Sequence, residues 1–547
     1  MVILEENRHA YEALTRYNYF PNQKEDETEL PPCFSTSQFT PEIVELLVSL
    51  KDDRKQGYDQ VEYSISRHNN VPRRLGLIHP KAYAHLAKTI SDNYKEIKEK
   101  IKSTASMIKP EMHADGRILI MNYEDVSEKI NRVSNESFGK RFRVHSDISS
   151  CFHTIYSHSI PWAALGFKEA KKALNDKSLQ THWSNRLDAN VRMCKRNETL
   201  GLPIGPATSS VVVELILANV DAQLDNKGFG YKRYIDDYVC HCETHEKAKD
   251  FIRELSSALE KFKLNLNLNK TNIIELPDPN TDEWISRLSS SLSSPYVDAN
   301  FTRRKYTLSE AQNYLDVAIR LNNETPDGSV LKYAIKTIVP NLADFAIPSI
   351  LDSALNLCWH FPIILPHIET LLSSNQIDVT NYKEKINAII LENAKNNRSD
   401  GMAWGLYYLW KFKLQVSIEA YSLVLKSKDC ISILLLYSLK QTEQHIIDFA
   451  FDLLCKSDYE KDQYWLLLYQ LYIDGKIKKI YKNDDAFELL KTYKVNFLPN
   501  KDIKSVTETY CDYISKFSMF GNLDSKTEDP PEAVEFTLWA KDYMAPS

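Results

Sequence analysis

Two adjacent aspartates interrupt a run of strand-forming residues, YKRYIDDYVCHC at 231–242. Tyrosine, isoleucine and valine favour a β-strand, in which successive side chains point to opposite faces. Asp236 and Asp237 carry like charges, and bringing two carboxylates together is unfavourable. Two interpretations are open at this point. Either the pair lies harmlessly in the solvated turn of a β-hairpin, or a positive partner is expected beside it.

The pattern along the rest of the chain divides it into parts, because 547 residues are too many for one hydrophobic core. Residues 1–110 mix polar loops with helical segments, and residues 111–280 alternate β-type runs with helices. Two prolines and a serine cluster then predict a linker at 281–300. In residues 301–547, apolar residues recur at steps of three and four, which is typical of packed amphipathic helices. We therefore predict an α+β fold followed by an all-α array or solenoid.

Composition narrows the class of protein. No stretch approaches the twenty apolar residues of a membrane span, and the nine cysteines show no framework spacing, so we expect a cytoplasmic protein with reduced thiols and no membrane partner. The formal net charge of -6 argues against a protein that coats nucleic acid generally. It is compatible with a basic groove on an acidic body.

A third aspartate, Asp147, is a candidate partner for this pair in a metal site. Asp147 ends an apolar run in FRVHSDISSCF at 142–152, where small residues and then Phe152 follow it. A strand-borne aspartate near a hairpin-borne pair is what a two-metal site requires, since two Mg²⁺ ions share carboxylate ligands and relieve their repulsion. The chemistry that such a site serves is in-line displacement at phosphorus.

Two further segments lie around these acids. GLPIGPATS at 201–209 places Gly205 in a turn-rich loop before an apolar helix, where a backbone can approach a base pair or a phosphate. LNLNLNKT at 264–271 places Lys270 just before a strand, where its ammonium could reach a triphosphate. Each signal is weak by itself, because a solvated lysine or an ordinary turn explains it equally well.

Order and spacing together carry a resemblance. Asp147, GLPIGPATS, YIDD and LNLNLNKT follow the order of four palm motifs, and the sequence resembles reverse transcriptases. Within that superfamily it is similar to the bacterial abortive-infection (Abi) reverse transcriptases, the AbiK type and its prophage-borne relatives. HSDISSCFHTIYSHSIPWAALG at 145–166 resembles their extended first motif. The likeness covers roughly residues 110–275 and is looser in RRLGLIHPKAYAHLAKTI at 73–90.

The resemblance implies a palm and fingers followed by a HEAT-like helical domain in place of the usual thumb. It implies that Asp147, Asp236 and Asp237 hold Mg²⁺ (or Mn²⁺) for catalysis. Phe152 would be the steric gate that excludes a 2′-hydroxyl, although a core aromatic is the plainer interpretation of that residue. Arg143 and Arg73 would contact triphosphate or strand backbone, where solvated charges are the ordinary alternative.

The family also implies a particular activity. Its members are known for untemplated synthesis of DNA from deoxynucleoside triphosphates, primed by a tyrosine hydroxyl of the enzyme, in defence against phage. The product would be single-stranded DNA attached covalently to the protein, and the protein would be a homo-oligomer. Tyr11, Tyr17 and Tyr19 near the polar N-terminus are the candidate primers. The sequence does not specify the priming tyrosine, the nucleotide preference, the stoichiometry or the phage trigger.

Other interpretations stay open. A retron-like defence reverse transcriptase would use a template and a cognate RNA. A scaffold with a vestigial palm would act through its helical array, although the intact aspartate set argues against it. CHCETH at 240–245 invites a zinc interpretation, but no second ligand pair completes a tetrahedron, so core packing is favoured.

Overall fold

The run that contains the paired aspartates folds into a β-hairpin that forms one side of a four-stranded sheet. The computed structural model describes residues 2–21, 29–51, 54–67, 71–108, 110, 113, 116–119, 126–173, 181–279, 282–292, 305–326 and 329–499. Strands β4 (Tyr231–Tyr234) and β5 (Asp237–Cys242) form the hairpin, followed in the sheet by β3 (Phe142–Asp147) and β6 (Asn272–Glu275). All three pairings are antiparallel, in the order β4-β5-β3-β6.

The register gives the sheet two different faces. Asp147 lies opposite Asp237, and Arg143 lies opposite His241, so these side chains share one polar, partly exposed face. Because strand residues alternate, Val144, Tyr238 and Cys240 point to the other face and are buried. Helices α11 (Ala207–Asp225) and α12 (His245–Glu260) pack against this buried face. The open face is therefore the one that carries the carboxylates.

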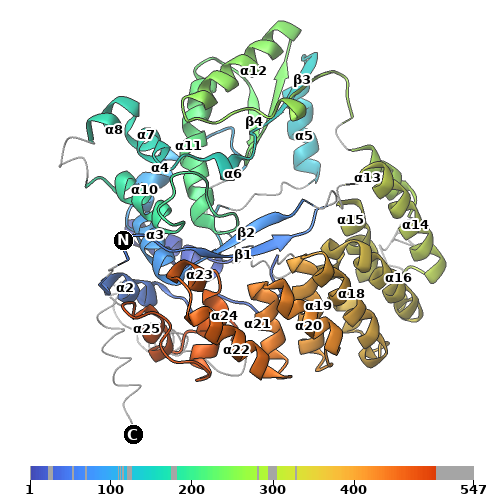
Figure 1. Ribbon diagram of the computed structural model, residues 1–547. Helices are drawn as coiled ribbons and strands as arrows, with labels where there is room; N and C mark the ends of the chain where they lie inside the picture. Colours follow the sequence, from blue (N-terminus) through green and yellow to red (C-terminus); the bar gives the residue numbers. More distant parts are fainter. Residues whose placement is uncertain are drawn as a thin grey trace, which may run out of the picture.

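The N-terminal part forms the region predicted as fingers. β1 (Gln60–Ile65) and β2 (Arg73–Ile78) pair as an antiparallel hairpin that extends across the middle of Figure 1. Around it lie α1 (Val2–Glu12), the π-helix η1 (Ala13–Tyr17), α2 (Pro41–Ser49), α3 (Pro80–Asp92) and α4 (Tyr94–Lys100). The segment between β3 and the hairpin adds α6 (Cys151–Thr154), α7 (Ser159–Leu165), α8 (Phe167–Ala173) and α10 (Trp183–Met193). One further helix, α5 (Val126–Ser137), directly precedes β3.

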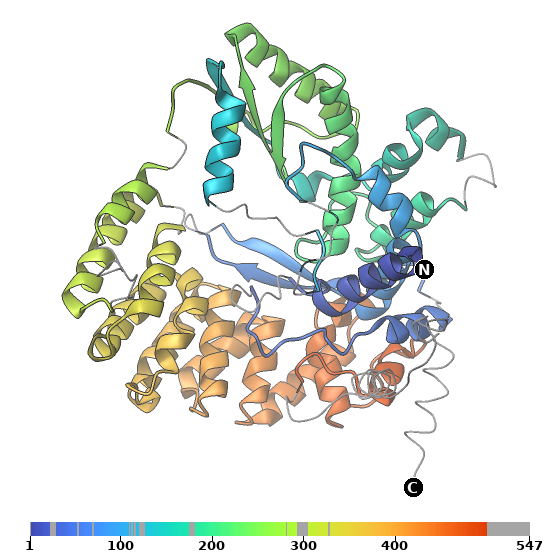
Figure 2. The ribbon, with the colours of Figure 1, turned by 180° about the vertical axis from the view of Figure 1, so that it is seen from behind.

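Beyond residue 305 the described chain forms helices and no named strand. Figures 1 and 2 show these helices stacked in an arc that begins below the palm sheet and ends beside α2. The helices are α14 (Leu308–Glu324), α15 (Ser329–Ile338), α16 (Ile347–His360), α17 (Glu369–Leu372), α18 (Lys383–Lys395), α19 (Ser399–Lys411), α20 (Ile418–Ser427), α21 (Cys430–Ser438), α22 (Glu443–Leu454), α23 (Asp458–Asp462), α24 (Trp465–Ile473) and α25 (Ala486–Thr492). The fold is thus mixed α/β and rich in helices, and a HEAT-like repeat stays a prediction.

The predicted linker at 281–300 needs a correction in its first half. Glu283–Ser290 form helix α13, which packs against α14 and α15, and Trp284 makes a T-shaped ring contact with Tyr333 at 5.7 Å. The serine cluster lies at the end of this helix, where serine is well tolerated. Trp284 and the buried Leu288 are four residues apart and share one helix face. Residues 293–300 lie outside the described part.

The end of the helical arc closes back onto the fingers. Arg54 makes two hydrogen bonds with Asp462, at 3.0 and 2.6 Å, and the backbone N–H of Asp59 donates to the same carboxylate. The indole N–H of Trp465 donates to the backbone oxygen of Leu77 in β2 at 2.9 Å. Both Asp462 and Trp465 are fully buried. The helical region and the fingers therefore share one core, and the arc holds the β1–β2 hairpin in place.

One described helix, α11, is long and apolar enough to cross a membrane by length and composition. In this structure 78% of its most apolar window is buried inside the protein. It also carries Glu214 and Asp221, which are paired with a buried arginine. The helix is accounted for as the core helix beneath the sheet.

Candidate active site

Three carboxylates converge at the end of the open sheet face. Asp147 is the last residue of β3, Asp237 is the first residue of β5 directly opposite, and Asp236 lies in the hairpin turn. Each offers an oxygen, and these oxygens all lie within 4.8 Å of one another. Asp147 is 7% exposed, and the other two are partly buried. The predicted trio is therefore one compact acidic site, formed by two neighbouring strands and their turn.

The turn that carries Asp236 is conformationally unusual. Ile235 has φ of +58°, a left-handed conformation that β-branched residues rarely adopt. The carbonyl oxygen of Ile235 accepts a hydrogen bond from Nη1 of Arg233 at 3.0 Å, and the backbone N–H of Ile148 donates to the oxygen of Asp236. Strained backbone persists where surrounding contacts over-determine it. Hydrogen bonds from Arg233 and Ile148 thus fix the turn, and Asp236 lies at its tip.

Arg233 is the anchor of this turn. Its side chain is fully buried and makes bidentate ion pairs with Glu214 and Asp221 of α11, both closest at 2.7 Å. Tyr238 adds a hydrogen bond to Asp221, and Ser106 adds one to Glu214. The two acids raise the pKa of Arg233 even though burial alone would lower it. A buried charge is tolerated only with such complete pairing.

In contrast, the negative charges of Asp236 and Asp237 are not balanced by enough positive charge nearby. Burial, followed by the charges of Asp237 and Asp147, raises the pKa of Asp236 to about 6. The pKa of Asp237 is raised as well, first by burial and then by Asp147. A cluster of three hard oxygen donors whose negative charge is poorly neutralised fits Mg²⁺ or Mn²⁺. The residues present therefore suit the divalent ions that reverse-transcriptase-like sites use, although the metal's identity stays a prediction.

The raised pKa of Asp236 predicts a change in melting temperature that can be measured without any enzymatic activity. Because the pKa of Asp236 in the folded protein exceeds that of a free aspartate, its charge opposes folding above about pH 6 and this penalty fades as the pH falls toward 4. We expect Asp236→Asn to raise the metal-free melting temperature at pH 7.5 by about 2 °C or more. Adding Mg²⁺ should stabilise the parent protein and not this variant. Equal metal-dependent shifts in both proteins would contradict a metal site at the trio.

Two residues of the LNLNLNKT segment reach Asp147. Nδ2 of Asn267 donates to Oδ2 of Asp147 at 3.0 Å, and Nζ of Lys270 lies 3.5 Å from the same oxygen. Lys270 stands on the short 3₁₀ helix η2 (Leu268–Lys270) before β6, and its side chain is 64% exposed. An exposed ammonium beside the carboxylates is placed to meet a negatively charged ligand at their edge.

Phe152 and Gly205 belong to two segments that run together beside the acids. The backbone N–H of Leu202 donates to the oxygen of Phe152 at 2.7 Å, and that of Gly201 donates to Ile155 at 2.8 Å. Phe152 is partly buried against the core on α6. Gly205 has φ of +125°, and a Cβ there would meet the ring of Pro21 at 2.6 Å. Glycine is thus required where this loop meets the N-terminal segment.

Part of the chain matches a known protein family. Residues 81–305 match the family model described as reverse transcriptase (RNA-dependent DNA polymerase). The chain contains a reverse transcriptase domain. This matched segment includes all three aspartates, Phe152, Gly205 and Lys270. It confirms the predicted reverse transcriptase domain, whereas membership of the abortive-infection group stays a proposal.

Neither the curated proteins nor the solved structures narrow the family further. No curated protein matches the sequence. Among solved structures, telomerase from Candida tropicalis, in a complex with the TWJ fragment of telomeric RNA, is similar at 11% sequence identity and a TM-score of 0.27. That match covers 72% of this chain and 64% of the telomerase chain.

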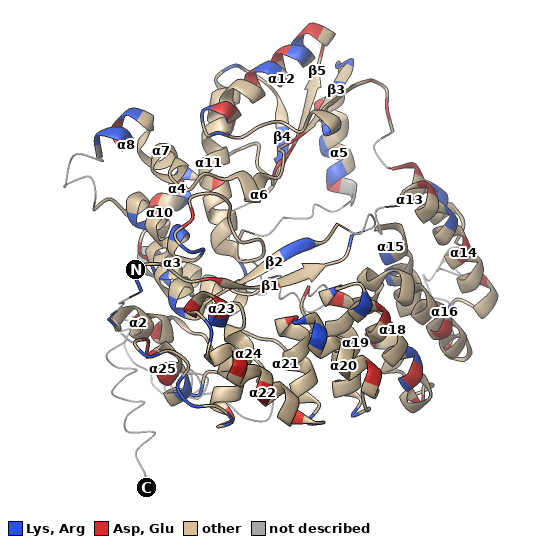
Figure 3. Ribbon diagram, in the orientation of Figure 1, with Lys and Arg blue, Asp and Glu red and all other residues tan. Residues whose placement is uncertain are grey.

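Basic residues from the N-terminal part and from the segment after α10 gather around His153. Burial and then the charges of Lys195, Arg73, Arg74 and Arg67 lower the pKa of His153, the residue after Phe152. The backbone N–H of Gly76 in β2 donates to the oxygen of Ile204, which brings the hairpin against the Gly205 loop. Figure 3 shows the basic start of β2 in the middle of the molecule. Arg73 itself also lies 3.9 Å from Glu29. The structure thus gathers the predicted Arg73 with Lys195 and Arg67, which the sequence pattern did not single out.

Arg143 lies farther away. It shares the open face with Asp147, but four residues of strand, roughly 13 Å, separate the two. Its guanidinium pairs with Asp278, and its charge helps, after burial, to lower the pKa of His241. The structure therefore does not place Arg143 among the groups around the carboxylates.

The three tyrosines proposed as primers have different environments. Tyr19 is fully buried, donates to the oxygen of Ile78 and stacks on Tyr83 at 3.9 Å. Tyr11 is 9% exposed and donates to Glu45 at 2.9 Å. Tyr17 is partly exposed on η1. A hydroxyl in the core is inaccessible to a nucleotide in this conformation, so the structure favours Tyr17 over the other two.

Helix α5 lies on the open face of the palm sheet. Nη2 of Arg132 donates to the hydroxyl of Tyr234 at 2.5 Å, and Glu136 lies 4.0 Å from His241. Apart from four partly buried residues, the described side chains of the helix are exposed. A helix whose described side chains are mostly exposed buries little apolar surface, so it is held weakly. α5 therefore covers part of the face that carries the three aspartates.

The zinc interpretation of CHCETH finds no support in the described residues. Cys240 and Cys242 are buried with their sulfurs 3.6 Å apart, on the face beneath α12, while His241 points to the other face. The only group of three or more potential metal ligands found in the described ranges is the aspartate trio.

Proposed function

We propose that the protein is a nucleotidyltransferase that polymerises deoxynucleotides by in-line phosphoryl transfer at Asp147, Asp236 and Asp237, and that it acts in abortive-infection defence against phage in the cytoplasm. The observation that carries the catalytic part is the convergence of three carboxylate oxygens within 4.8 Å inside a segment that matches reverse transcriptases. Divalent ions held there would activate the attacking oxygen and neutralise the leaving pyrophosphate.

The protein's own residues supply the remaining functions. Asn267 fixes one oxygen of Asp147 by a hydrogen bond, and Arg233 fixes the turn that presents Asp236. Lys270 supplies positive charge beside Asp147, and the basic residues around His153 supply more near Phe152, where a triphosphate needs it. The glycine loop brings the backbone close to the incoming nucleotide.

Phe152 sets the choice of sugar in this proposal. Replacing it by alanine removes the ring that would meet a 2′-hydroxyl, so we expect discrimination against ribonucleotides to fall by about tenfold or more, equivalent to about 1.4 kcal/mol. The measurement is the ratio of kcat/KM for a deoxynucleotide and for its ribonucleotide. Phe138→Ala is the matched control, because Phe138 is 87% exposed and outside the loop contacts. An unchanged ratio in Phe152→Ala would show that Phe152 is not a steric gate.

We further propose that synthesis is untemplated and starts from a tyrosine of the enzyme. Two observations support this. Helix α5 occupies part of the open face that a bound duplex would use. The N-terminal segment lies against the Gly205 loop, since the backbone N–H of Ala207 donates to the oxygen of Asn18 at 3.0 Å. Tyr17, next to Asn18, is the candidate primer that this contact favours.

The position of α5 gives a specific test. We expect Arg132→Ala to loosen the helix and to raise incorporation on an added primer–template by about tenfold or more, because a hydrogen bond to a charged group contributes about 1.5–3 kcal/mol. Lys129→Ala, on an exposed position of the same helix, should leave incorporation unchanged. No gain in Arg132→Ala would show that α5 does not limit access.

A template-dependent reverse transcriptase is the second candidate. The family description, RNA-dependent DNA polymerase, favours it. Incorporation that needs an added RNA template would support this candidate over untemplated synthesis. In either case the attached or released product, and assembly of the protein as a homo-oligomer, are separate proposals that labelling and light scattering would test.

A further inference from the structure

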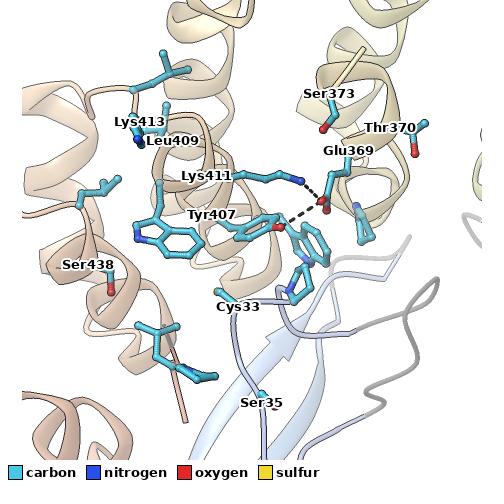
Figure 4. Close-up of a pocket in the computed structure, with 18 of the residues that line it drawn as sticks. Cys33, Ser35, Glu369, Thr370, Ser373, Tyr407, Leu409, Lys411, Lys413 and Ser438 are labelled. Carbon is cyan, nitrogen blue, oxygen red and sulfur yellow. Dashed lines mark hydrogen bonds and ion pairs between the residues drawn. The ribbon is translucent and has the colours of Figure 1, made fainter. Parts of the chain in front are cut away.

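A large cavity lies along the helical arc, and none of the three aspartates lines it. It is a groove of about 2520 Å³ bordered by α15, α16, α17, α19, α21 and α24 on one side and by the N-terminal segment 32–38 on the other. Figure 4 shows Cys33 and Ser35 of this segment facing Tyr407, Lys411 and Ser438 of the helices. We call it the helical groove. Pockets for small molecules have about 300–1,000 Å³, so a groove of this size suits a polymer.

The helical groove is basic although the chain is acidic. Its lining includes five cationic side chains, Arg16, Lys336, Lys411, Lys413 and Lys440. Two carboxylates, Glu369 and Asp474, line it as well, which leaves a formal excess of three positive charges (five minus two). The whole chain has a formal net charge of -6. Positive charge is therefore concentrated at this groove, as expected for binding a phosphate backbone.

The individual contacts leave much of this charge available. Glu369 is shared by Lys411 and the hydroxyl of Tyr407, as the dashed lines in Figure 4 show. Lys413 has no ion-pair partner in the part of the chain that the structure describes, and it is exposed. Lys440 is 58% exposed and lies 3.7 Å or more from its acidic neighbours. Exposed pairs of this kind are weak and exchange readily for a phosphate.

Aromatic side chains lie between the cations. Trp410, at the end of α19, is 39% exposed and offers a ring to the groove. Trp404 also lines the groove and is 2% exposed, and its indole N–H has no acceptor in the described residues. A buried donor without a partner is unfavourable.

Cations alternating with an exposed ring are the pattern of sites for unpaired nucleic acid, where phosphates pair with lysines and bases stack on aromatic faces. We infer that the helical groove binds single-stranded DNA. The inference rests on the proposed function, because the strand in question is the polymerase's own product. A base-paired duplex fits less well, since its bases are not free to stack on Trp410.

The N-terminal segment connects the groove with the active site. Arg16 lines the groove, and two residues farther along the chain Asn18 accepts a hydrogen bond from Ala207 after the Gly205 loop. Tyr17 lies between them. A strand that starts at this tyrosine therefore begins next to a residue of the groove lining and next to a residue that contacts the Gly205 loop. The groove would take up the part of the strand already made, while its growing 3′ end stays at the acids.

Binding can be tested without catalysis. In EDTA and without nucleotides, fluorescence anisotropy with a labelled thirty-nucleotide oligo(dT) is measured on Asp236→Asn, so that failure of polymerisation does not affect the result. We expect Trp410→Ala to weaken binding by about fivefold to a hundredfold. The matched control is Trp359→Ala, because Trp359 is also 39% exposed but lies outside the groove lining.

Two lysine variants separate charge from stacking. We expect Lys413→Ala with Lys440→Ala to weaken binding and to lower the dependence of log K on log salt by about one for each lost phosphate contact. Lys395→Ala with Lys456→Ala, on exposed positions outside the lining, is the control. Tighter binding of oligo(dT) than of oligo(U) would identify the DNA product rather than an RNA as the ligand. Groove variants that bind like their controls would overturn the inference. So would equal competition by duplex DNA, or binding of polyglutamate but not of oligo(dT), which would indicate an acidic protein partner.

Discussion

Asp236→Asn is expected to abolish nucleotide incorporation, by roughly a thousandfold or more, while the protein stays folded. The substitution keeps the shape of the side chain and removes one of the three charges that lie within 4.8 Å. Metal-assisted phosphoryl transfer depends on shared carboxylate ligands, so losing one removes the clamp on the reacting phosphate. Steady-state incorporation of labelled deoxynucleotide measures the effect, with circular dichroism as the check on folding.

Asp250→Asn is the control for this variant. Asp250 lies exposed on α12 in a surface pair with Arg253, so its charge has little influence on stability or on the site. Asp250→Asn should retain parent activity. Retention of activity in Asp236→Asn would contradict the assignment of the trio and would favour the scaffold interpretation instead.

Arg233→Met is expected to have the largest effect on stability. The variant would leave Glu214 and Asp221 buried without their partner, because both pair with this one side chain at 2.7 Å. Removing one member of a buried ion pair costs about 3–5 kcal/mol, so the melting temperature should fall steeply or the protein should fail to accumulate. Differential scanning calorimetry at pH 7.5 gives the measurement.

A combined variant separates folding from positioning. Arg233→Met with Glu214→Gln and Asp221→Asn removes all three charges, so we expect it to recover much of the lost stability. It should not recover activity, because the carbonyl of Ile235 still lacks the donor that holds the Asp236 turn. Recovery of kcat along with stability would show that Arg233 has only a structural role.

The acidic site was predictable from the sequence because its determinants are local. YIDD encodes a short turn, and FRVHSD encodes a strand that ends in an aspartate. One antiparallel register is enough to bring Asp147 opposite Asp237. The basic cluster around His153 was predictable only in part, since Lys195 reaches it from α10's C-terminal side through a chain reversal that no motif encodes.

Long-range partners could not be predicted in this way. Arg233 is one of many charged residues in the sequence, and its acids occur on an otherwise apolar helix 12 and 19 residues earlier. The closure of the helical arc on the fingers joins Arg54 to Asp462, 408 residues apart. Two prolines and a serine cluster predict a linker at 281–300, whereas the contact of Trp284 with Tyr333 helps to hold Glu283–Ser290 as helix α13.

If the three aspartates catalyse untemplated, protein-primed DNA synthesis, the purified protein should label itself with deoxynucleotides. The most direct measurement incubates the purified protein with labelled deoxynucleotides and Mg²⁺, without added nucleic acid, and resolves the products on a denaturing gel beside Asp236→Asn. We expect label that stays with the protein through denaturation, disappears in Asp236→Asn and maps to a tyrosine by peptide analysis. Label that appears only when a primer and template are supplied, and then on nucleic acid alone, would contradict it.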